Sequence, residues 1–204
     1  MATVTEARLE AISLAARSFA HDLGNLMLPG VSGFAQIAES EGLTDRQRRM
    51  CTMAEAAFAA MASPREALET VIDRPREATA AGEDLEAWWR RSVGIIRPLV
   101  PGRPAIRSEF AADLPAVGLP GPLIGRALLA VLLDAAEQQM LEDELSLTCG
   151  AGDRSVRIIL RGFRGDTAGL TDGIAIATAA LSPFDGTCAA ADQQVALTLP
   201  RHSG

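Results

Sequence analysis

The sequence predicts an α+β protein in which a two-helix hairpin is followed by an α/β sandwich. Two contrasting compositions support this fold class. Residues 5–73 are rich in alanine and carry apolar residues at helical spacing, whereas residues 98–204 are rich in glycine and proline and contain runs of alternating apolar residues. The segment 74–84 between them has the composition of a linker. We therefore expect two domains, a helical hairpin in residues 1–75 and a sandwich in residues 84–204.

A long helix is predicted at the start of the first region. Its length should be roughly 35 residues, or about 50 Å at 1.5 Å per residue. Pro29 should bend it, because a proline inside a helix removes one backbone hydrogen bond. The apolar and small residues that predict this helix recur at alternating spacings of three and four: Leu9, Ile12, Ala16, Phe19, Leu23, Leu26, Gly30, Gly33 and Ile37.

A second helix should run back along the first one. Gly42 interrupts the apolar pattern, and Thr44 is placed to cap a new helix. A lone hairpin would leave much of its apolar stripe in water, so we expect two chains to pair their hairpins into a dimeric four-helix bundle. The stripe of this second helix comprises Met50, Met53, Ala54, Ala57, Met61, Leu68 and Ile72.

The second region predicts a sequence of helices and strands. The strands are indicated by alternation of apolar and polar residues, and the helices by longer apolar stretches. In chain order we expect an amphipathic helix over 84–100, short strands or turns over 104–120, an apolar helix over 123–140, a hairpin of 144–152 with 154–163, a helix over 169–182 and a closing strand over 193–202.

Composition and charge exclude several classes of function. The net charge of −7 disfavours nucleic acid as the main partner. No apolar run approaches the roughly 20 residues that span a bilayer, and the acidic-polar N-terminus lacks the features of a signal peptide, so we expect a cytoplasmic protein without membrane contact. All 19 basic residues are arginines, which excludes lysine-dependent chemistry. Cys51, Cys149 and Cys188 lie far apart and should be small buried apolar residues.

One histidine of the first helix has neighbours that suggest chemistry. His21 lies midway between Phe19 and Leu23, which turns it away from the apolar stripe, and Asn25 follows one helical turn later. By itself this pattern also fits an exposed histidine without a function. The stretch "AHDLGNLMLPGVSGFAQIAE", however, resembles the phosphoacceptor helix of bacterial two-component histidine kinases, in the variant with Asp and Asn one and four positions after the His and Pro eight positions after it.

The resemblance implies a role for each polar residue of this motif. His21 would be the phosphoacceptor, because a neutral imidazole nitrogen is a competent nucleophile. Asp22 would orient or deprotonate the ring, and Asn25 would position a water or an incoming carboxylate. A receiver aspartate with bound magnesium could then take the phosphoryl group without any nucleotide. The chain itself would need no cofactor, since the magnesium belongs to the partner receiver domain.

The second region resembles the α/β sandwich of the histidine kinase ATPase domain, in a degenerate form. Asp134-Ala135 replaces the usual Asn-Ala pair. "RGFRG" (161–165) replaces the base-binding motif, with Arg161 at its aspartate and Phe163 at a glycine. The phosphate lid shortens to residues 165–177. We expect no ATP binding.

A phosphoacceptor dimer joined to a degenerate ATPase fold resembles the bacterial histidine phosphotransferases of the ChpT type. The resemblance implies two partners, the receiver domains of a hybrid histidine kinase and of a response regulator. Arg17, Arg48 and Arg49 are candidates for contact with an acidic receiver.

Two other classes of function remain open. One is an enzyme, either a divergent histidine kinase or a phosphatase that uses Asn25. The other is a noncatalytic dimeric scaffold in which His21 is incidental. His202 is a weaker candidate phosphoacceptor, because we expect the C-terminal end to be frayed.

Overall fold

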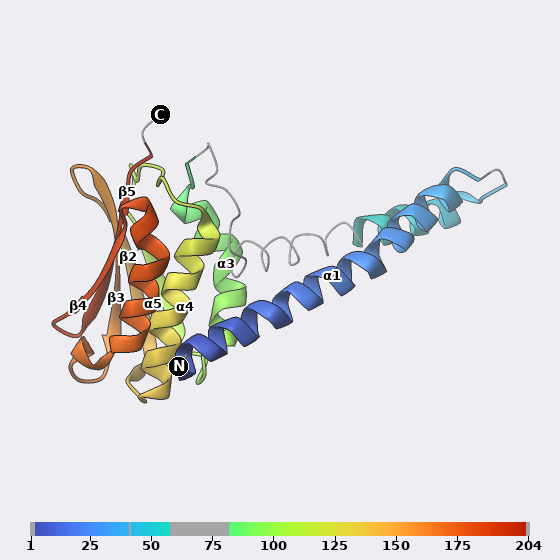
Figure 1. The fold of residues 1–204 in the computed structure, drawn as a ribbon. Coiled ribbons are helices and arrows are strands. Elements are labelled where there is room, and N and C mark those ends of the chain that lie inside the picture. The colour runs from blue at the N-terminus through green and yellow to red at the C-terminus, as the bar shows by residue number, and fades with distance from the viewer. Residues whose placement is uncertain (1–2, 41, 58–81, 203–204) are drawn as a thin grey trace.

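The computed structural model of the protein describes residues 3–40, 42–57 and 82–202 (Figure 1). The first region contains helix α1 (Val4–Ala38) and a helix over 45–57. The second region contains three further helices, five strands and two short 3-10 turns. In chain order these are α3 (Leu85–Leu99), β1 (Ala105–Phe110), α4 (Gly121–Glu137), β2 (Leu141–Ala151), β3 (Ser155–Phe163), η1 (Thr167–Gly169), α5 (Thr171–Leu181), η2 (Ser182–Phe184), β4 (Thr187–Ala191) and β5 (Gln194–Pro200). An α+β chain is therefore confirmed, while the domain bounds stay predictions.

Helix α1 has the predicted length and a clear N-terminal cap. The Thr3 hydroxyl accepts a hydrogen bond from the backbone N–H of Glu6 at 3.2 Å, which satisfies one of the donors that a helix start leaves unpaired. The helix continues through Pro29 to Ala38, and the bend expected at Pro29 stays a prediction. The 35 residues thus form one long helix that extends away from the sheet and helices of the second region (Figure 1).

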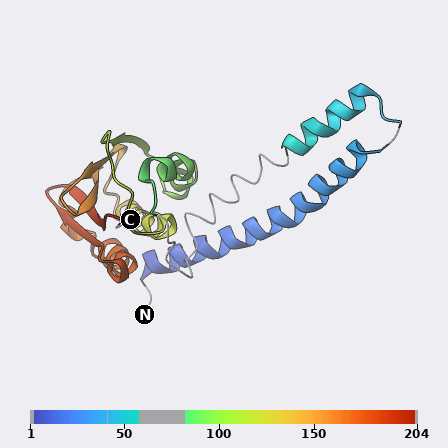
Figure 2. The ribbon, with the colours of Figure 1, turned by 90° about the horizontal axis from the view of Figure 1, so that it is seen from above.

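The second helix begins after Thr44, as predicted. Thr44 and Gln47 cap each other: the backbone N–H of Thr44 donates to Gln47 Oε1 at 2.9 Å, and the N–H of Gln47 donates to Thr44 Oγ1 at 3.4 Å. This helix lies beside the C-terminal part of α1 (Figure 2). Three residues of its predicted stripe lie outside the described residues: Met61, Leu68 and Ile72. Most of the linker over 74–84 also lies outside them.

The five strands form one mixed sheet in the order β1-β2-β3-β5-β4. β1 runs parallel to β2, and the other neighbours are antiparallel. The hairpin of β2 with β3 and the closing strand β5 match the sequence prediction. The sequence analysis missed β4, and it left open whether the segment 104–120 would form strands, which it does at β1.

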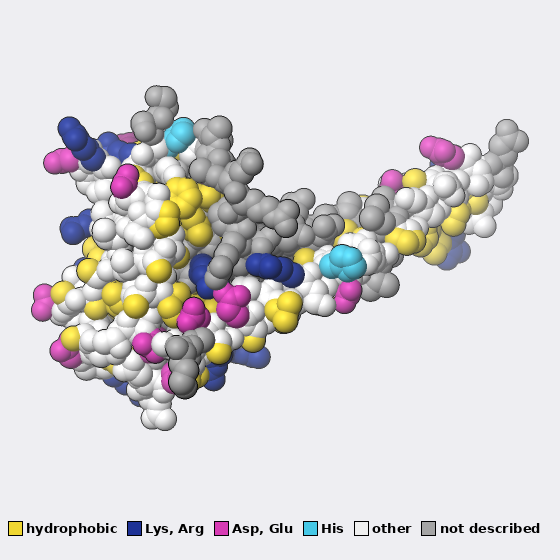
Figure 3. Space-filling model, viewed as in Figure 1, with side chains coloured by type: hydrophobic (Ala, Val, Ile, Leu, Met, Phe, Trp, Pro, Cys, Tyr) yellow, Lys and Arg dark blue, Asp and Glu magenta, His cyan; other side chains and the backbone are white. Residues whose placement is uncertain are grey.

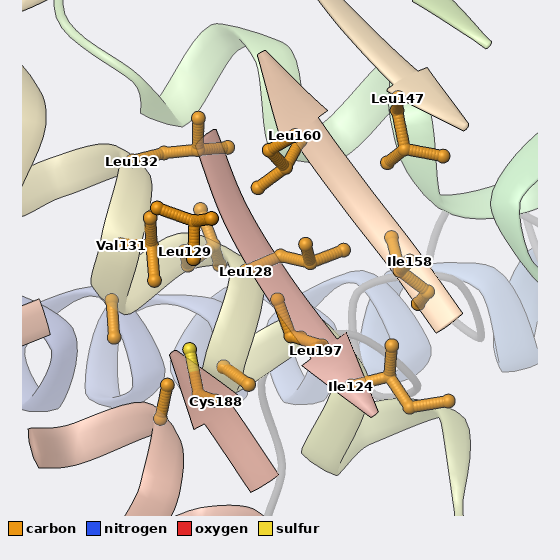
Figure 4. Close-up of a cluster of buried hydrophobic side chains, with 14 of the residues drawn as sticks. Ile124, Leu128, Leu129, Val131, Leu132, Leu147, Ile158, Leu160, Cys188 and Leu197 are labelled. Carbon is orange, nitrogen blue, oxygen red and sulfur yellow. The ribbon is translucent and has the colours of Figure 1, made fainter. Parts of the chain in front are cut away.

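The core lies between the sheet and helices α3, α4 and α5, which cover one of its faces (Figure 1). α4 is buried continuously from Leu123 to Ala135. Buried residues alternate over 145–149 of β2, 156–160 of β3 and 195–199 of β5, so that every second side chain there faces the helices (Figure 4). Burying one such side chain contributes about 1.5–3 kcal/mol. We call this sheet with its three helices, residues 83–202, the α/β unit.

The three cysteines are buried, as predicted. Cys149 and Cys188 lie in the core of the α/β unit, and Cys51 lies in the helical region. Among the helices that the structure describes, none combines the length and the apolar character required to cross a membrane.

Candidate functional site

His21 lies on the exposed side of α1. Its side chain is 73% exposed, and those of Asp22 and Asn25 are exposed too. The reason is the helical period, because the buried residues of this part of α1 follow a different line along the helix. These buried residues are Ala16, Ala20, Gly24 and Met27. A histidine side chain on the surface of the long helix is visible in Figure 3.

Two polar neighbours contact the same ring nitrogen of His21. Asp22 Oδ1 lies 3.3 Å from Nδ1, and Asn25 Nδ2 lies 3.2 Å from the same atom. The carboxylate of Asp22 accepts a hydrogen bond when Nδ1 carries the proton, whereas the amide of Asn25 donates to Nδ1 when Nε2 carries it. The two neighbours therefore stabilise opposite tautomers of the ring.

The tautomer favoured by Asp22 is the one suited to nucleophilic chemistry. With the proton held on Nδ1, the lone pair of Nε2 faces solvent. Within the part of the chain that the structure describes, no hydrogen bond reaches Nε2. The arrangement presents one accessible nitrogen whose electron pair is available to an electrophile on a second molecule.

The structure brings only one of the three candidate arginines near His21. Arg17 is exposed and precedes His21 by four residues, so both project from the same side of α1. Arg48 donates instead from Nη1 to the carbonyl oxygen of Ala38 at 3.1 Å. Ala38 lies 17 residues beyond His21, about 25 Å along the helix. Arg48 and its neighbour Arg49 therefore do not share the surface around His21.

The backbone of His202 is hydrogen-bonded within the α/β unit, and the expected fraying of the C-terminal end stays a prediction. Its backbone N–H donates to the carbonyl oxygen of Ala116 at 2.9 Å, next to a β-bridge between Val117 and Arg201. Among the described residues, only His21 of the two histidines has a side-chain hydrogen bond to an acid or an amide.

Asp134 occupies the N-terminal end of α5. This residue of α4 is only 5% exposed, and its Oδ2 accepts a hydrogen bond from the backbone N–H of Gly173 at 2.7 Å. Gln138 donates from Nε2 to Asp134 Oδ1 at 2.8 Å and to the carbonyl oxygen of Gly169 at 3.0 Å. The carboxylate thus supplies the anion that the positive end of a helix attracts.

The backbone of α5 lies directly against α4 at Gly173. A Cβ atom placed on Gly173 would approach the carbonyl oxygen of Ala130 to 2.9 Å and the Cβ of Asp134 to 3.0 Å. Only glycine allows this approach without displacing one of the helices. The first turn of α5 and the middle of α4 are therefore in contact, with Asp134 between them.

The two substitutions in the "RGFRG" stretch lie on opposite faces of the sheet. Phe163 is 3% exposed and belongs to the core. Arg161 alternates with the buried Leu160, so it is exposed on the face away from α4. The assignment of Arg161 to the position of a base-reading aspartate stays a prediction. Phe163 is the bulky side chain of this stretch that belongs to the core.

The sequence analysis did not identify the contact between α1 and the α/β unit. Arg126 of α4 donates from Nη2 to Glu10 Oε1 of α1 at 2.9 Å, and its side chain is 10% exposed. Basic and acidic side chains gather at this junction (Figure 3). The available signal was the one arginine of the apolar stretch 123–133, because a charge buried in this way needs a partner.

The described residues contain no group of three or more His, Cys, Asp or Glu side chains that could hold a metal ion. Asp134 belongs to no such group, and its two carboxylate oxygens accept hydrogen bonds from Gly173 and Gln138.

Comparisons with known proteins add little to this description. No protein-family model matches the chain, and no curated protein is similar to it. Among solved structures, the Acinetobacter baumannii histidine kinase AdeS is 13% identical with a TM-score of 0.45, over 84% of this chain and 92% of that chain. Full-length ShkA in complex with AMPPNP is 18% identical with a TM-score of 0.39, over 96% of this chain and 47% of that chain. Similarity at this level bears neither on the chemistry of the site nor on its partners.

Proposed function

We propose that this protein is a histidine phosphotransferase of a two-component phosphorelay, of the kind that its phosphoacceptor motif resembles. His21 carries a phosphoryl group between the aspartates of two receiver domains, one from a hybrid histidine kinase and one from a response regulator. The observation that carries the proposal is the exposed imidazole whose Nδ1 contacts Asp22 while Nε2 faces solvent.

The transfer step needs no reactant other than the phosphorylated receiver. Nε2 attacks the phosphorus of a receiver acyl phosphate, so that an N–P bond forms, the P–O bond to the aspartate breaks, and the aspartate leaves as a carboxylate. The proton stays on Nδ1, where the carboxylate of Asp22 compensates the positive charge of the phosphorylated ring. In the second half of the relay, another receiver aspartate attacks the phosphorus and neutral imidazole leaves. Magnesium on the receiver would assist both steps.

Independence from ATP is supported by the region around Asp134. A nucleotide phosphate at the N-terminal end of α5 would meet a carboxylate that already accepts the N–H of Gly173. Two negative charges at one helix end repel each other. The close contact of Gly173 with α4 also argues against space for a ligand between these helices.

A homodimer is supported by the predicted apolar stripe of α1, which one chain covers only in part. Leu9 and Ala16 of this stripe are buried, whereas Phe19 and Ile37 are 56% and 47% exposed. Pairing of two hairpins into a four-helix bundle would cover the exposed part.

The decisive experiment follows a phosphoryl label in the absence of nucleotide. The purified protein is mixed with a labelled phospho-receiver, and the chain is tested for acid-labile, base-stable label. Wild type should accept the label, and His21→Ala should accept none. Asp22→Ala should slow transfer by about ten- to a hundredfold, because the ring loses its orienting group but keeps its nucleophile. Asn25→Ala should leave part of the transfer intact.

The controls separate the competing functions. His202→Ala should behave as wild type, since that ring lacks the acid and the amide found at His21. Labelled ATP with magnesium should label nothing, whereas labelling of His21 from ATP would indicate a divergent histidine kinase. Rapid loss of phosphate from the receiver without label on the chain would indicate a phosphatase. If no cognate receiver transfers its label to wild type, the scaffold is the better description.

A further inference from the structure

We propose that Arg126 is a positioning residue for phosphotransfer: its ion pair with Glu10 fixes α1 to the α/β unit, so that a receiver domain at His21 also contacts that unit. This inference rests on the proposed function. The inference assigns to Arg126, which lies far from the reacting atoms, control over how well the receiver binds.

The junction between α1 and the α/β unit combines apolar packing with one largely buried ion pair. Leu9 and Ala16 of α1 belong to the same hydrophobic cluster as α4, and Arg126 pairs with Glu10 at 2.9 Å. A second pair, Arg8 with Glu137 at 3.9 Å, is exposed on both sides and contributes little. A hollow of about 400 Å³ opens beside these contacts, between α1, α4 and α5. Arg126 lines this hollow, and its ion pair with Glu10 joins α4 to α1 beside it.

Helix geometry connects this ion pair to the phosphoacceptor. Glu10 and His21 are eleven residues apart, which is close to three helical turns, so their side chains project from the same side of α1 about 16 Å apart. The helix between them contains no proline, and Pro29 lies beyond His21. A rotation of α1 by about 10° at Glu10 would therefore move His21 by about 3 Å.

A receiver domain is large enough to reach the junction from His21. A small domain is about 30 Å across, so a receiver centred on His21 extends about 15 Å along α1. That distance brings its edge to the position where the α/β unit meets Glu10 on the same side of the helix. The receiver thus has two surfaces to bind, and their relative position depends on Arg126.

The test measures transfer kinetics with wild type and variants of the full-length protein. The probe is the labelled phospho-receiver used for the His21 experiment. Arg126→Gln should raise KM for the phospho-receiver about tenfold and leave kcat within about twofold, because the second contact is lost while the imidazole is unchanged. Arg126→Lys keeps the charge and should restore KM to within about threefold of wild type. Arg90→Gln, which breaks the exposed pair of Arg90 with Glu86 in α3, is the matched control and should change neither constant.

The outcomes separate a positioning role from a structural one. A merely structural role would lower the active fraction and hence kcat, with KM unchanged, and that result would overturn the inference. An unchanged KM with full activity would overturn it as well. If Arg126→Gln fails to fold, Glu10→Gln breaks the same pair from the exposed side of α1 and must show the KM increase. If wild type accepts no label, the proposed function itself fails. If wild type and Arg126→Gln accept label with equal KM, only the positioning role is refuted.

Discussion

Burial raises the pKa of the Cys149 and Cys188 thiols to about 12, from an ordinary value of 9.0. The folded chain therefore holds these protons at a pH where the unfolded chain has released them. The stabilising effect is complete below pH 9 and decreases as the pH rises toward 12. The sequence makes this range informative, because it contains no tyrosine and all its basic residues are arginines. In the range from 9 to 12, the side chains that titrate are those of the cysteines.

We expect the free energy of unfolding to fall between pH 9 and 11 by up to about 1.4 kcal/mol per pH unit for each of the two thiols. Denaturant unfolding under reducing conditions, followed by the fluorescence of Trp88 and Trp89, measures this slope. Cys149→Ala and Cys188→Ala should each reduce the slope, and both substitutions together should remove most of it. Cys51 is present in all these variants, so its contribution cancels. An unchanged slope in the double variant would contradict the prediction.

Single residues also show where sequence reasoning succeeds and where it does not. The exposure of His21 follows from its position between two residues of the apolar stripe, and helical geometry alone is sufficient for that prediction. The side of the sheet on which Arg161 lies depends on the register of β3, which a motif alignment does not determine. The pairing of Asp134 with Gly173 joins residues 39 positions apart, and no local pattern indicates it.

At the level of elements, the contact of α5 with α4 makes one glycine indispensable. Gly173→Ala should destabilise the fold by about 1–3 kcal/mol, because the added Cβ would lie 2.9 Å from the carbonyl oxygen of Ala130. Gly94 in α3 provides the matched control, since a Cβ added there has nothing within 4 Å. Gly94→Ala should stabilise the fold by about 0.4–1 kcal/mol. Thermal or denaturant unfolding of both variants checks the opposite signs, and a stabilised Gly173→Ala would refute the close contact.

Elements with strong periodicity were predictable, and those without it were not. The spacing of apolar residues located α1, and alternation located the hairpin of β2 with β3. The Thr44 cap followed from residue type alone. β4 was missed because its sequence "TCAAA" consists of small residues, whose burial depends on the neighbouring strand rather than on any pattern of their own.

At the level of the whole molecule, the exposed apolar side chains of the helical region lead to a prediction about assembly. Phe19 is 56% exposed, Met50 is 61% exposed and Met53 is 72% exposed. Exposed apolar residues of this size on one region are typical of an interface. The purified protein should therefore sediment as a dimer at micromolar concentration. Phe19→Asp should shift it toward the monomer, whereas Ser18→Asp, at an exposed neighbouring position, should not.

A well-folded wild-type monomer at that concentration would contradict the four-helix bundle. It would not by itself contradict the phosphotransfer proposal, because the contacts of His21 with Asp22 and Asn25 lie within one chain. The two proposals are therefore tested independently.

The carboxylate of Asp134 at the end of α5 has a consequence for the protein in the cell. A free ligand stabilises its site by an amount that grows with the concentration of the ligand. Asp134 is part of the chain, so its contribution at this helix end is the same at every nucleotide concentration. On the proposed function, the α/β unit keeps one shape and one stability in an energy-rich cell and in a starved one. The flow of phosphoryl groups through His21 would then depend on the supply of phosphorylated receivers and not on a nucleotide bound to this chain.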